Sequence, residues 1–134
     1  MAEVRRISSN SDFEKAVGYS RAVVDDDYVH ISGTTGFDYG AMTISDDAVE
    51  QAHQAFRNIE DVLARARCSF ADLVRVRYYM ADRADYERLT PVFKHYLGPN
   101  PPAATAIIAG LVDPRMKIEI EATARRPDSQ ERVE

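Results

Sequence analysis

A chain of 134 residues with 45% hydrophobic and 29% charged residues has the size and balance of one globular domain. Its apolar runs fall far short of the ~18 residues that a membrane span requires, and its net charge of -5 opposes sequence-independent attraction to nucleic acid. The single cysteine, Cys68, excludes an internal disulfide and has no Cys or His neighbour at the spacing of a structural zinc site. We therefore expect one domain, residues 1–126, followed by a polar and disordered tail at residues 127–134.

The first forty residues contain short strands and a glycine-rich segment. Polar Ser8–Asp12 lies where a secretory signal would carry its apolar stretch, which predicts a cytoplasmic protein. Three segments read as strands, Val4–Ile7, Ala22–Val24 and Tyr28–Ser32, and the acidic Asp25–Asp27 predicts a hairpin turn between the last two. Gly33–Gly40 contains three glycines, which predicts a loop whose backbone can closely approach a ligand or another chain.

The segment Asp46–Arg67 has the pattern of an amphipathic helix. Its apolar residues recur at intervals of one, three or four: Ala48, Val49, Ala52, Ala55, Phe56, Ile59, Val62, Leu63 and Ala66. Ser45 is the predicted N-cap, with Asp46 and Asp47 in the first turn, where the helix dipole favours negative charge. Ser69–Asp72 then matches a capping box and predicts one short turn.

The remaining chain predicts a strand, a helical region and two further strands. Leu73–Met80 alternates apolar and polar side chains in its first half, which predicts a strand with Val74 and Val76 inward. Asp82–Leu97 is helical in pattern, but a proline costs about 3 kcal/mol inside a helix, so Thr90 and Pro91 could instead be the N-cap and first residue of a shorter helix. After a rigid loop at Gly98–Pro102, two strands are expected at Ala103–Ala109 and Lys117–Arg125.

This order of elements predicts an α+β fold. Three strands, a helix, a strand, a second helix and two strands form a mixed sheet with two helices on one face. The opposite face of such a sheet must also be covered. An oligomer is the simplest way to cover it.

Five segments in order resemble the Rid family, also called YjgF or L-PSP. They are Tyr19–Val23, Val29–Gly33, Asn58–Ile59, Val74–Met80 and Lys117–Ala122, so the resemblance runs from about residue 19 to residue 124. It implies a chorismate-mutase-like α+β fold, a homotrimer with its sheets packed into a central barrel, and small-molecule pockets at the clefts between subunits. The best understood members hydrolyse 2-aminoacrylate and related 2-imino acids to 2-keto acids and ammonia, with no metal or cofactor.

The resemblance also implies which residues form the site, and one of them has changed. In those members a Pro-Ala-Arg-Ser motif supplies an arginine that binds the substrate carboxylate, and the first glutamate of a Glu-Ile-Glu motif orients the attacking water. Here Glu119 is present, but the first motif reads Pro102-Ala103-Ala104-Thr105 and the family's frequent cysteine is replaced by Ala106. An arginine gives a carboxylate two charge-assisted hydrogen bonds of about 1.5–3 kcal/mol each, and Ala104 gives none. We therefore expect a substrate other than the usual 2-imino acid.

Each candidate residue also has a simpler interpretation. Strand alternation alone would make Glu119 a solvated residue. Tyr19 could be a core or interface tyrosine, and Ser32 and Gly33 could be a strand end followed by a turn glycine. Arg75 and Arg77 share one strand face, either as surface charges or as a substitute for the missing arginine, and the three histidines receive no role. With the resemblance, we expect Glu119 to be catalytic and the substrate to be bound by Tyr19, Ser32, Gly33, Ala104 and Thr105.

Three functions follow from these expectations. The first is a trimeric, cofactor-free hydrolase that deaminates a small reactive enamine or imine. The second is a non-catalytic trimer that binds a small metabolite for regulation, and it is motivated by Ala104. The third, a ribonuclease, is implied by the L-PSP name, but the acidic charge balance argues against it.

Overall fold

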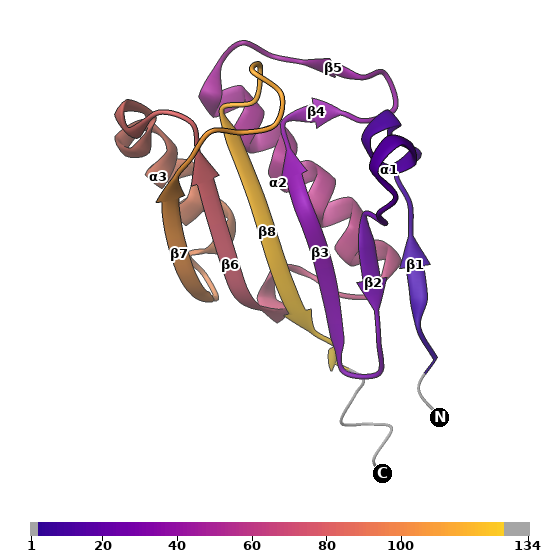
Figure 1. Cartoon of the computed structure of the whole chain (residues 1–134). Coiled ribbons are helices and arrows are strands. Elements are labelled where there is room, and N and C mark those ends of the chain that lie inside the picture. The colour runs from indigo at the N-terminus through magenta and orange to yellow at the C-terminus, as the bar shows by residue number, and fades with distance from the viewer. Residues whose placement is uncertain (1–2, 128–134) are drawn as a thin grey trace.

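The computed structural model describes residues 3–127 and shows a mixed sheet with two long helices on one face (Figure 1). Its elements are β1 (Arg5–Ile7), α1 (Asp12–Val17), β2 (Ala22–Val24), β3 (Tyr28–Thr35), β4 (Phe37–Asp38), β5 (Thr43–Ile44), α2 (Ala48–Arg65), η1 (Phe70–Asp72), β6 (Leu73–Met80), η2 (Arg83–Asp85), α3 (Tyr86–Leu97), β7 (Ala103–Ile108) and β8 (Ile118–Arg125). The main sheet has the order β1-β2-β3-β8-β6-β7, in which only β6 and β7 are parallel, and β4 and β5 form a separate pair. The predicted α+β class is confirmed.

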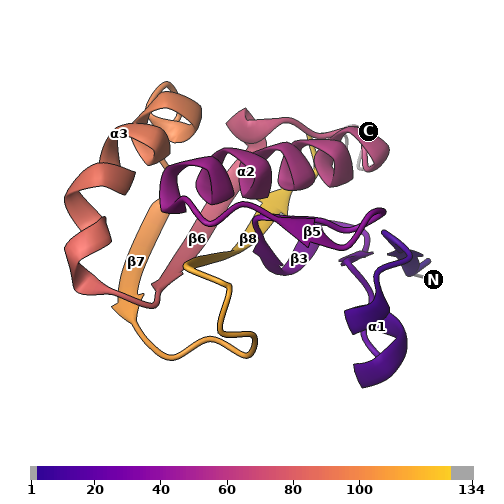
Figure 2. The same cartoon turned by 90° about the horizontal axis from the view of Figure 1, so that it is seen from above.

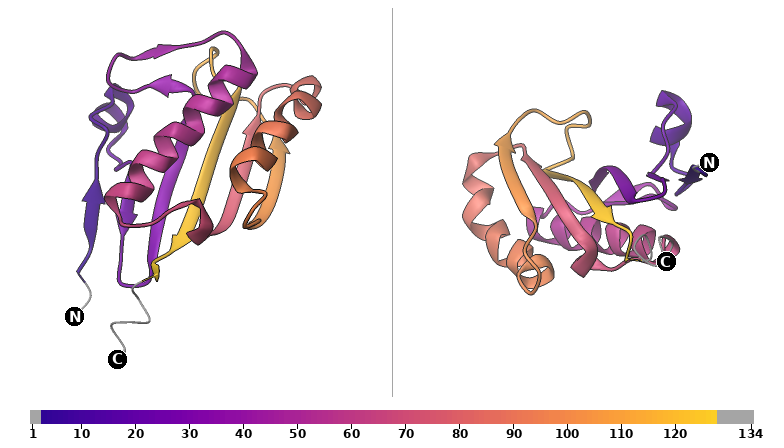
Figure 3. Two further views of the ribbon diagram at one scale, coloured as in Figure 1. Left: turned by 180° about the vertical axis from the view of Figure 1, so that it is seen from behind. Right: turned by 90° about the horizontal axis from the view of Figure 1, so that it is seen from below.

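Helices α2 and α3 lie together against one face of the sheet, as the rear view shows (Figure 3). Seen from above, α1 and the connection between β7 and β8 project on the other side (Figure 2). We call this side, opposite α2 and α3, the open face. Among residues 3–127, no helix is long and apolar enough to cross a membrane.

The core lies between α2, α3 and the sheet. Strand β8 directs Ile118, Ile120, Ala122 and Ala124 inward, all nearly or fully buried. From α2, Phe56 stacks on Tyr96 of α3, with ring centroids 4.4 Å apart. The apolar stripe predicted for Asp46–Arg67 is therefore the face that the sheet buries.

The predicted start of this helix was two residues early. Asp47, rather than Ser45, is the N-cap, and its carboxylate accepts a hydrogen bond from Glu50 N at 3.0 Å. The Ser45 hydroxyl instead accepts a hydrogen bond from Asp47 N at 3.1 Å, ahead of the first helical residue. The capping box predicted at Ser69–Asp72 is confirmed by η1.

Pro91 does not interrupt the second helix. Helix α3 runs continuously through it, so the shorter helix beginning at Pro91 was wrong. Proline cannot supply the N–H that the carbonyl of Glu87, four residues earlier, would normally accept. The Thr90 hydroxyl donates to that carbonyl at 3.2 Å, which offsets the loss.

Three other expectations need correction. Helix α1 was not predicted, although Ser11 and Glu14 form a capping box and Gly18 ends the helix at φ 88°. Gly33–Gly40 is not one loop, because β3 continues to Thr35 and β4 follows. Val74 is 43% exposed rather than inward, because the β6–β8 register shifts between Leu73 and Arg75. Of the predicted tail, residues 128–134 lie outside the described residues.

Candidate functional site

A cavity of about 450 Å³ opens on the open face of the sheet. Its walls come from α1, β3 and β8, from the segments just before β2 and just after β4, and from the connection between β7 and β8. The lining residues are Phe13, Val17, Tyr19, Ser32, Gly33, Thr35, Tyr39, Val112, Met116, Glu119 and Glu121. Apolar walls with a few convergent polar groups are typical of a small-molecule site.

Four of the six predicted site residues line this cavity: Tyr19, Ser32, Gly33 and Glu119. The other two, Ala104 and Thr105, lie on β7, which β6 separates from β8. Ala104 pairs with Val76, whose side chain is buried beneath the helices, so Ala104 belongs to the helix-covered side of the sheet edge. Within one chain these two residues are therefore apart from Glu119.

Gly33 allows Glu119 to lie directly against the backbone of β3. A Cβ at position 33 would lie 2.8 Å from the carboxyl carbon of Glu119 and closer still to one of its oxygens. The β3–β8 register shifts between Ile31 and Thr34, so Gly33 falls in an irregular stretch of the ladder. Such irregularities re-aim side chains near active sites. Here the absence of a side chain at Gly33 gives the Glu119 carboxylate its place on the cavity wall.

Ser32 contributes to the cavity mainly through its backbone position. Its N–H donates to the Arg21 carbonyl at 3.0 Å and its hydroxyl to the Ser20 carbonyl at 2.7 Å. Both donors are thus used within the fold. They hold the end of β3 in register with the segment that precedes β2.

The environment of Glu119 shifts its carboxyl towards the protonated form relative to a glutamate in water. Burial raises the pKa of its carboxyl above the ordinary value, and the nearby Glu121 carboxylate raises this pKa further, against the opposing effect of Arg21. A carboxylate with a raised pKa exchanges protons more readily near neutral pH. Glu119 therefore has the properties of a general acid or base.

Glu121 lies two residues further along β8 and also lines the cavity, although it was not among the predicted site residues. It accepts a short hydrogen bond from the Tyr79 hydroxyl and lies 3.7 Å from Arg77. Alternation along β8 puts Glu119 and Glu121 on one face, and that pattern could have identified Glu121. Phe13, Val17, Tyr39, Val112 and Met116 carried no comparable signal.

No Lys, Arg or His side chain from residues 3–127 lines the cavity. Arg75 and Arg77 border an adjoining hollow of about 300 Å³ on the open face, which shares Ser32 and Glu121 with the cavity. Arg75 donates to the Thr105 hydroxyl at 2.5 Å. Neither arginine reaches the cavity within one chain. In the same part of the chain, no three His, Cys, Asp or Glu side chains are close enough together to hold a metal ion.

On the expectation that Glu119 is catalytic, Gly33→Ala should lower kcat/KM by about 10²-fold, because displacing such a group by about 1 Å costs roughly that much. The added Cβ would push Glu119 off the wall, while the core on the other side of the sheet is untouched. Ammonia-release kinetics and thermal unfolding should be measured together. Gly110→Ala is the matched control, because its Cβ meets nothing within 4 Å and its backbone is not in the left-handed region that favours glycine. Loss of folding, rather than of turnover, in Gly33→Ala would contradict this assignment of Gly33.

Comparison with known proteins supports the fold and shows the family. The family model described as endoribonuclease L-PSP matches residues 9–126. A human protein named 2-iminobutanoate/2-iminopropanoate deaminase is 33% identical over 123 residues, which cover 90% of each chain. A YjgF-family structure from Mycobacterium tuberculosis is 35% identical with a TM-score of 0.84, covering 92% of this chain and 99% of that one. RidA from an Antarctic Psychrobacter bacterium is 31% identical with a TM-score of 0.76, covering 81% and 88%. The chain therefore belongs to the Rid family, also called YjgF or L-PSP.

Proposed function

We propose that this protein is a hydrolase that deaminates a small reactive enamine or imine, with Glu119 as its catalytic residue. The observation that carries the proposal is the half-buried Glu119 carboxylate, seated against Gly33 in an otherwise largely apolar cavity. The names of relatives such as the human deaminase support hydrolysis of a C=N bond. The L-PSP name alone points to RNA, and the net charge of -5 does not favour that substrate.

Glu119 can supply both proton transfers of this reaction. In its ionised form it takes a proton from water as the water oxygen bonds to the imine carbon, giving a carbinolamine. The imine reacts as its protonated iminium form, which an enamine reaches by taking up a proton at its β-carbon, so the carbinolamine carries a neutral amine. Glu119 then returns its proton to that nitrogen, the C–N bond breaks, and the hydroxyl proton passes to the departing ammonia, leaving a carbonyl compound and ammonium. One water is consumed, and Glu119 ends in its starting state.

The substrate is expected to lack the carboxylate of a 2-imino acid. Ala104 replaces the arginine that would bind such a group, and the described cavity lining contains two glutamates and no basic side chain. Desolvating a carboxylate next to two other carboxylates is unfavourable. A neutral or cationic imine with an apolar body fits these walls better.

The working unit in this proposal is a homotrimer in the cytoplasm. Strand β7 is an edge strand whose Ala104, Ala106 and Ile108 are exposed, and the open face carries the cavity. A neighbouring copy that covers the open face with this edge would bring Ala104 and Thr105 to the cavity of the next subunit. That arrangement would join the two halves of the predicted site.

The proposal is tested by ammonia release from a panel of freshly generated enamines and imines, half of them carrying a carboxylate and half neutral or cationic. We expect kcat/KM for the neutral and cationic compounds to exceed kcat/KM for those that carry a carboxylate by at least about tenfold. Ala104→Arg should reverse the preference, because it restores the bidentate partner of a carboxylate. Equal rates for wild type and Glu119→Gln across the whole panel would exclude the hydrolase.

A second candidate is a non-catalytic trimer that binds a small metabolite in the same cavity. The loss of the family arginine at Ala104 favours it, because a binding protein has no need to hold a reacting carboxylate. Thermal stabilisation by a metabolite, with no release of ammonia from any panel compound, would support this candidate. Turnover would exclude it.

A further inference from the structure

Arg21 is a buried arginine directly behind the cavity wall. Arg21 is 1% exposed and immediately precedes β2. Its guanidinium donates to the Gly33 carbonyl at 2.6 Å and to the Tyr19 hydroxyl at 3.3 Å. The same group lies 4.2 Å from the centre of the Tyr39 ring. Arg21 therefore contacts three residues that line the cavity without lining it itself.

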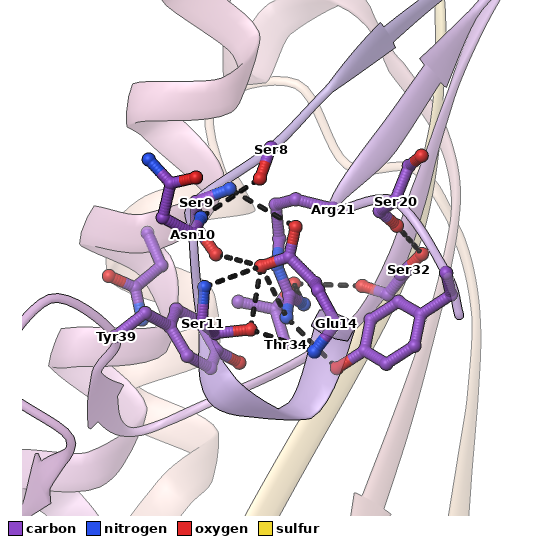
Figure 4. A network of polar contacts seen from close by, with 12 residues as sticks. Ser8, Ser9, Asn10, Ser11, Glu14, Ser20, Arg21, Ser32, Thr34 and Tyr39 are labelled. Carbon is purple, nitrogen blue, oxygen red and sulfur yellow. Dashed lines mark hydrogen bonds and ion pairs between the residues drawn. The ribbon is translucent and has the colours of Figure 1, made fainter. Parts of the chain in front are cut away.

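Glu14 of α1 supplies the counter-charge for Arg21. Its carboxylate lies 3.8 Å from the Arg21 guanidinium, and both side chains are almost fully buried. Burial alone would raise the pKa of Glu14, but hydrogen bonds from Ser11 and Ser9 prevail and lower it to about 2. Figure 4 shows Arg21 and Glu14 at the centre of this network, with Ser9 and Ser11 around the carboxylate. Glu14 is thus ionised at neutral pH.

A role in stability alone does not explain which acceptors the Arg21 guanidinium bonds. A buried pair adds little to stability once desolvation is counted. The Nε of Arg21 has no hydrogen-bond partner among the described residues, whereas the two terminal nitrogens are directed to Gly33, Tyr19 and Thr34. The side chain thus leaves one donor unpaired while its terminal nitrogens bond Gly33 and Tyr19 of the cavity wall and the buried Thr34.

We propose that Arg21 is a positioning residue of the site: it fixes the Gly33 backbone against which Glu119 lies, orients the Tyr19 hydroxyl, and places a permanent positive charge behind the Glu119 carboxylate. This role rests on the proposed function for its effect on turnover. Its effect on Glu119 itself does not depend on any substrate. In a buried setting such a charge acts with little screening by water or salt.

The charge of Arg21 acts on Glu119 together with several other groups. Those on the elements around Glu119 are Glu121 on β8, Tyr79 and Arg77 on β6, Tyr19 before β2, and Tyr39 after β4. Glu121 raises the pKa of Glu119, and the Arg21 guanidinium lowers it. Removing Arg21 should therefore move the titration of Glu119 to higher pH.

The test is a ¹³C NMR titration of the Glu119 side chain in the full-length protein, combined with the pH profile of kcat/KM. Three variants are compared with wild type: Arg21→Met, Arg21→Lys and Glu14→Gln. Arg21→Met should move the Glu119 titration and the acid limb of the profile to higher pH and lower kcat/KM by about tenfold to a hundredfold, mainly through kcat. Arg21→Lys keeps the charge and should leave the titration near its wild-type position.

Glu14→Gln is the matched control, because it breaks the same ion pair but keeps the positive charge. It should leave the Glu119 titration in place or move it to lower pH. If Arg21→Met does not fold, the double variant Arg21→Met/Glu14→Gln removes both buried charges. Its Glu119 titration should lie at higher pH than that of Glu14→Gln, because the two differ only by the charge of Arg21. An unchanged Glu119 titration in the Arg21→Met background, or an equal upward shift in Glu14→Gln, would overturn the proposal. An upward shift without turnover of any panel compound in wild type would instead reject the hydrolase and retain the role of Arg21.

Discussion

Replacing Glu119 with glutamine is expected to lower kcat/KM for imine hydrolysis by about 10³-fold, within the range that a general acid–base group contributes. Glutamine has nearly the same shape, so it keeps the contact with Gly33 and the packing of the cavity wall. It cannot accept a proton from water at working pH. The rate of ammonia release, measured at saturating and at low substrate concentration, should therefore fall mainly through kcat.

The pH dependence of activity provides a second test of Glu119 as the base. Since Glu119 acts as a base in the first step, activity is lost as pH falls through its pKa, and burial and Glu121 have moved that pKa upward. The wild-type profile should show an acid limb above the ordinary range of a glutamate, and Glu119→Gln should lack it. Glu121→Gln is the matched comparison, because it keeps the base and removes a charge that raises its pKa. Its acid limb should move to lower pH, and an acid limb that persists in Glu119→Gln would show that another group is the base.

Phe56→Ala is expected to lower the free energy of unfolding by about 3–5 kcal/mol, the usual cost of removing a buried phenylalanine ring. Phe56 is 0% exposed. Its ring stacks on Tyr96 and meets Phe70 and Phe93 edge-on, with centroids 6.0 and 6.3 Å away. The three neighbouring rings are large and rigid, so we expect them to collapse only partly into the space, and part of the loss should appear as a cavity cost.

Denaturant unfolding monitored by circular dichroism measures this loss, with all proteins at one concentration because the stability of an oligomer depends on it. Val112→Ala is the control, since Val112 is 89% exposed and its truncation should change the free energy of unfolding by less than about 0.5 kcal/mol. A loss below about 1 kcal/mol for Phe56→Ala would mean that the aromatic cluster is not part of the cooperative core.

Local rules were sufficient for the elements with a strong period. The apolar spacing of Asp46–Arg67 predicted α2, and Leu73–Met80 is exactly β6, because a repeat of 3.6 or 2 residues fixes which side can be buried. The same rules failed where a single specific contact, whether between strands or within a helix, decided the outcome. Val74 is exposed because of a register shift against β8, and Pro91 is tolerated because Thr90 satisfies the carbonyl that it leaves free.

The sequence by itself determined the family, the presence of Glu119 and the absence of an arginine at Ala104, because these depend only on residue identity and spacing. Only the tertiary structure placed Glu119 against Gly33 and Arg21 behind both, and it left Ala104 at a distant sheet edge. The cavity joins α1, the end of β3 and the start of β8, which lie far apart along the chain, and a shifted ladder between β3 and β8 aligns them. Sequence periodicity gives the face of each strand, but the contacts between distant segments depend on register and packing, which no local pattern encodes.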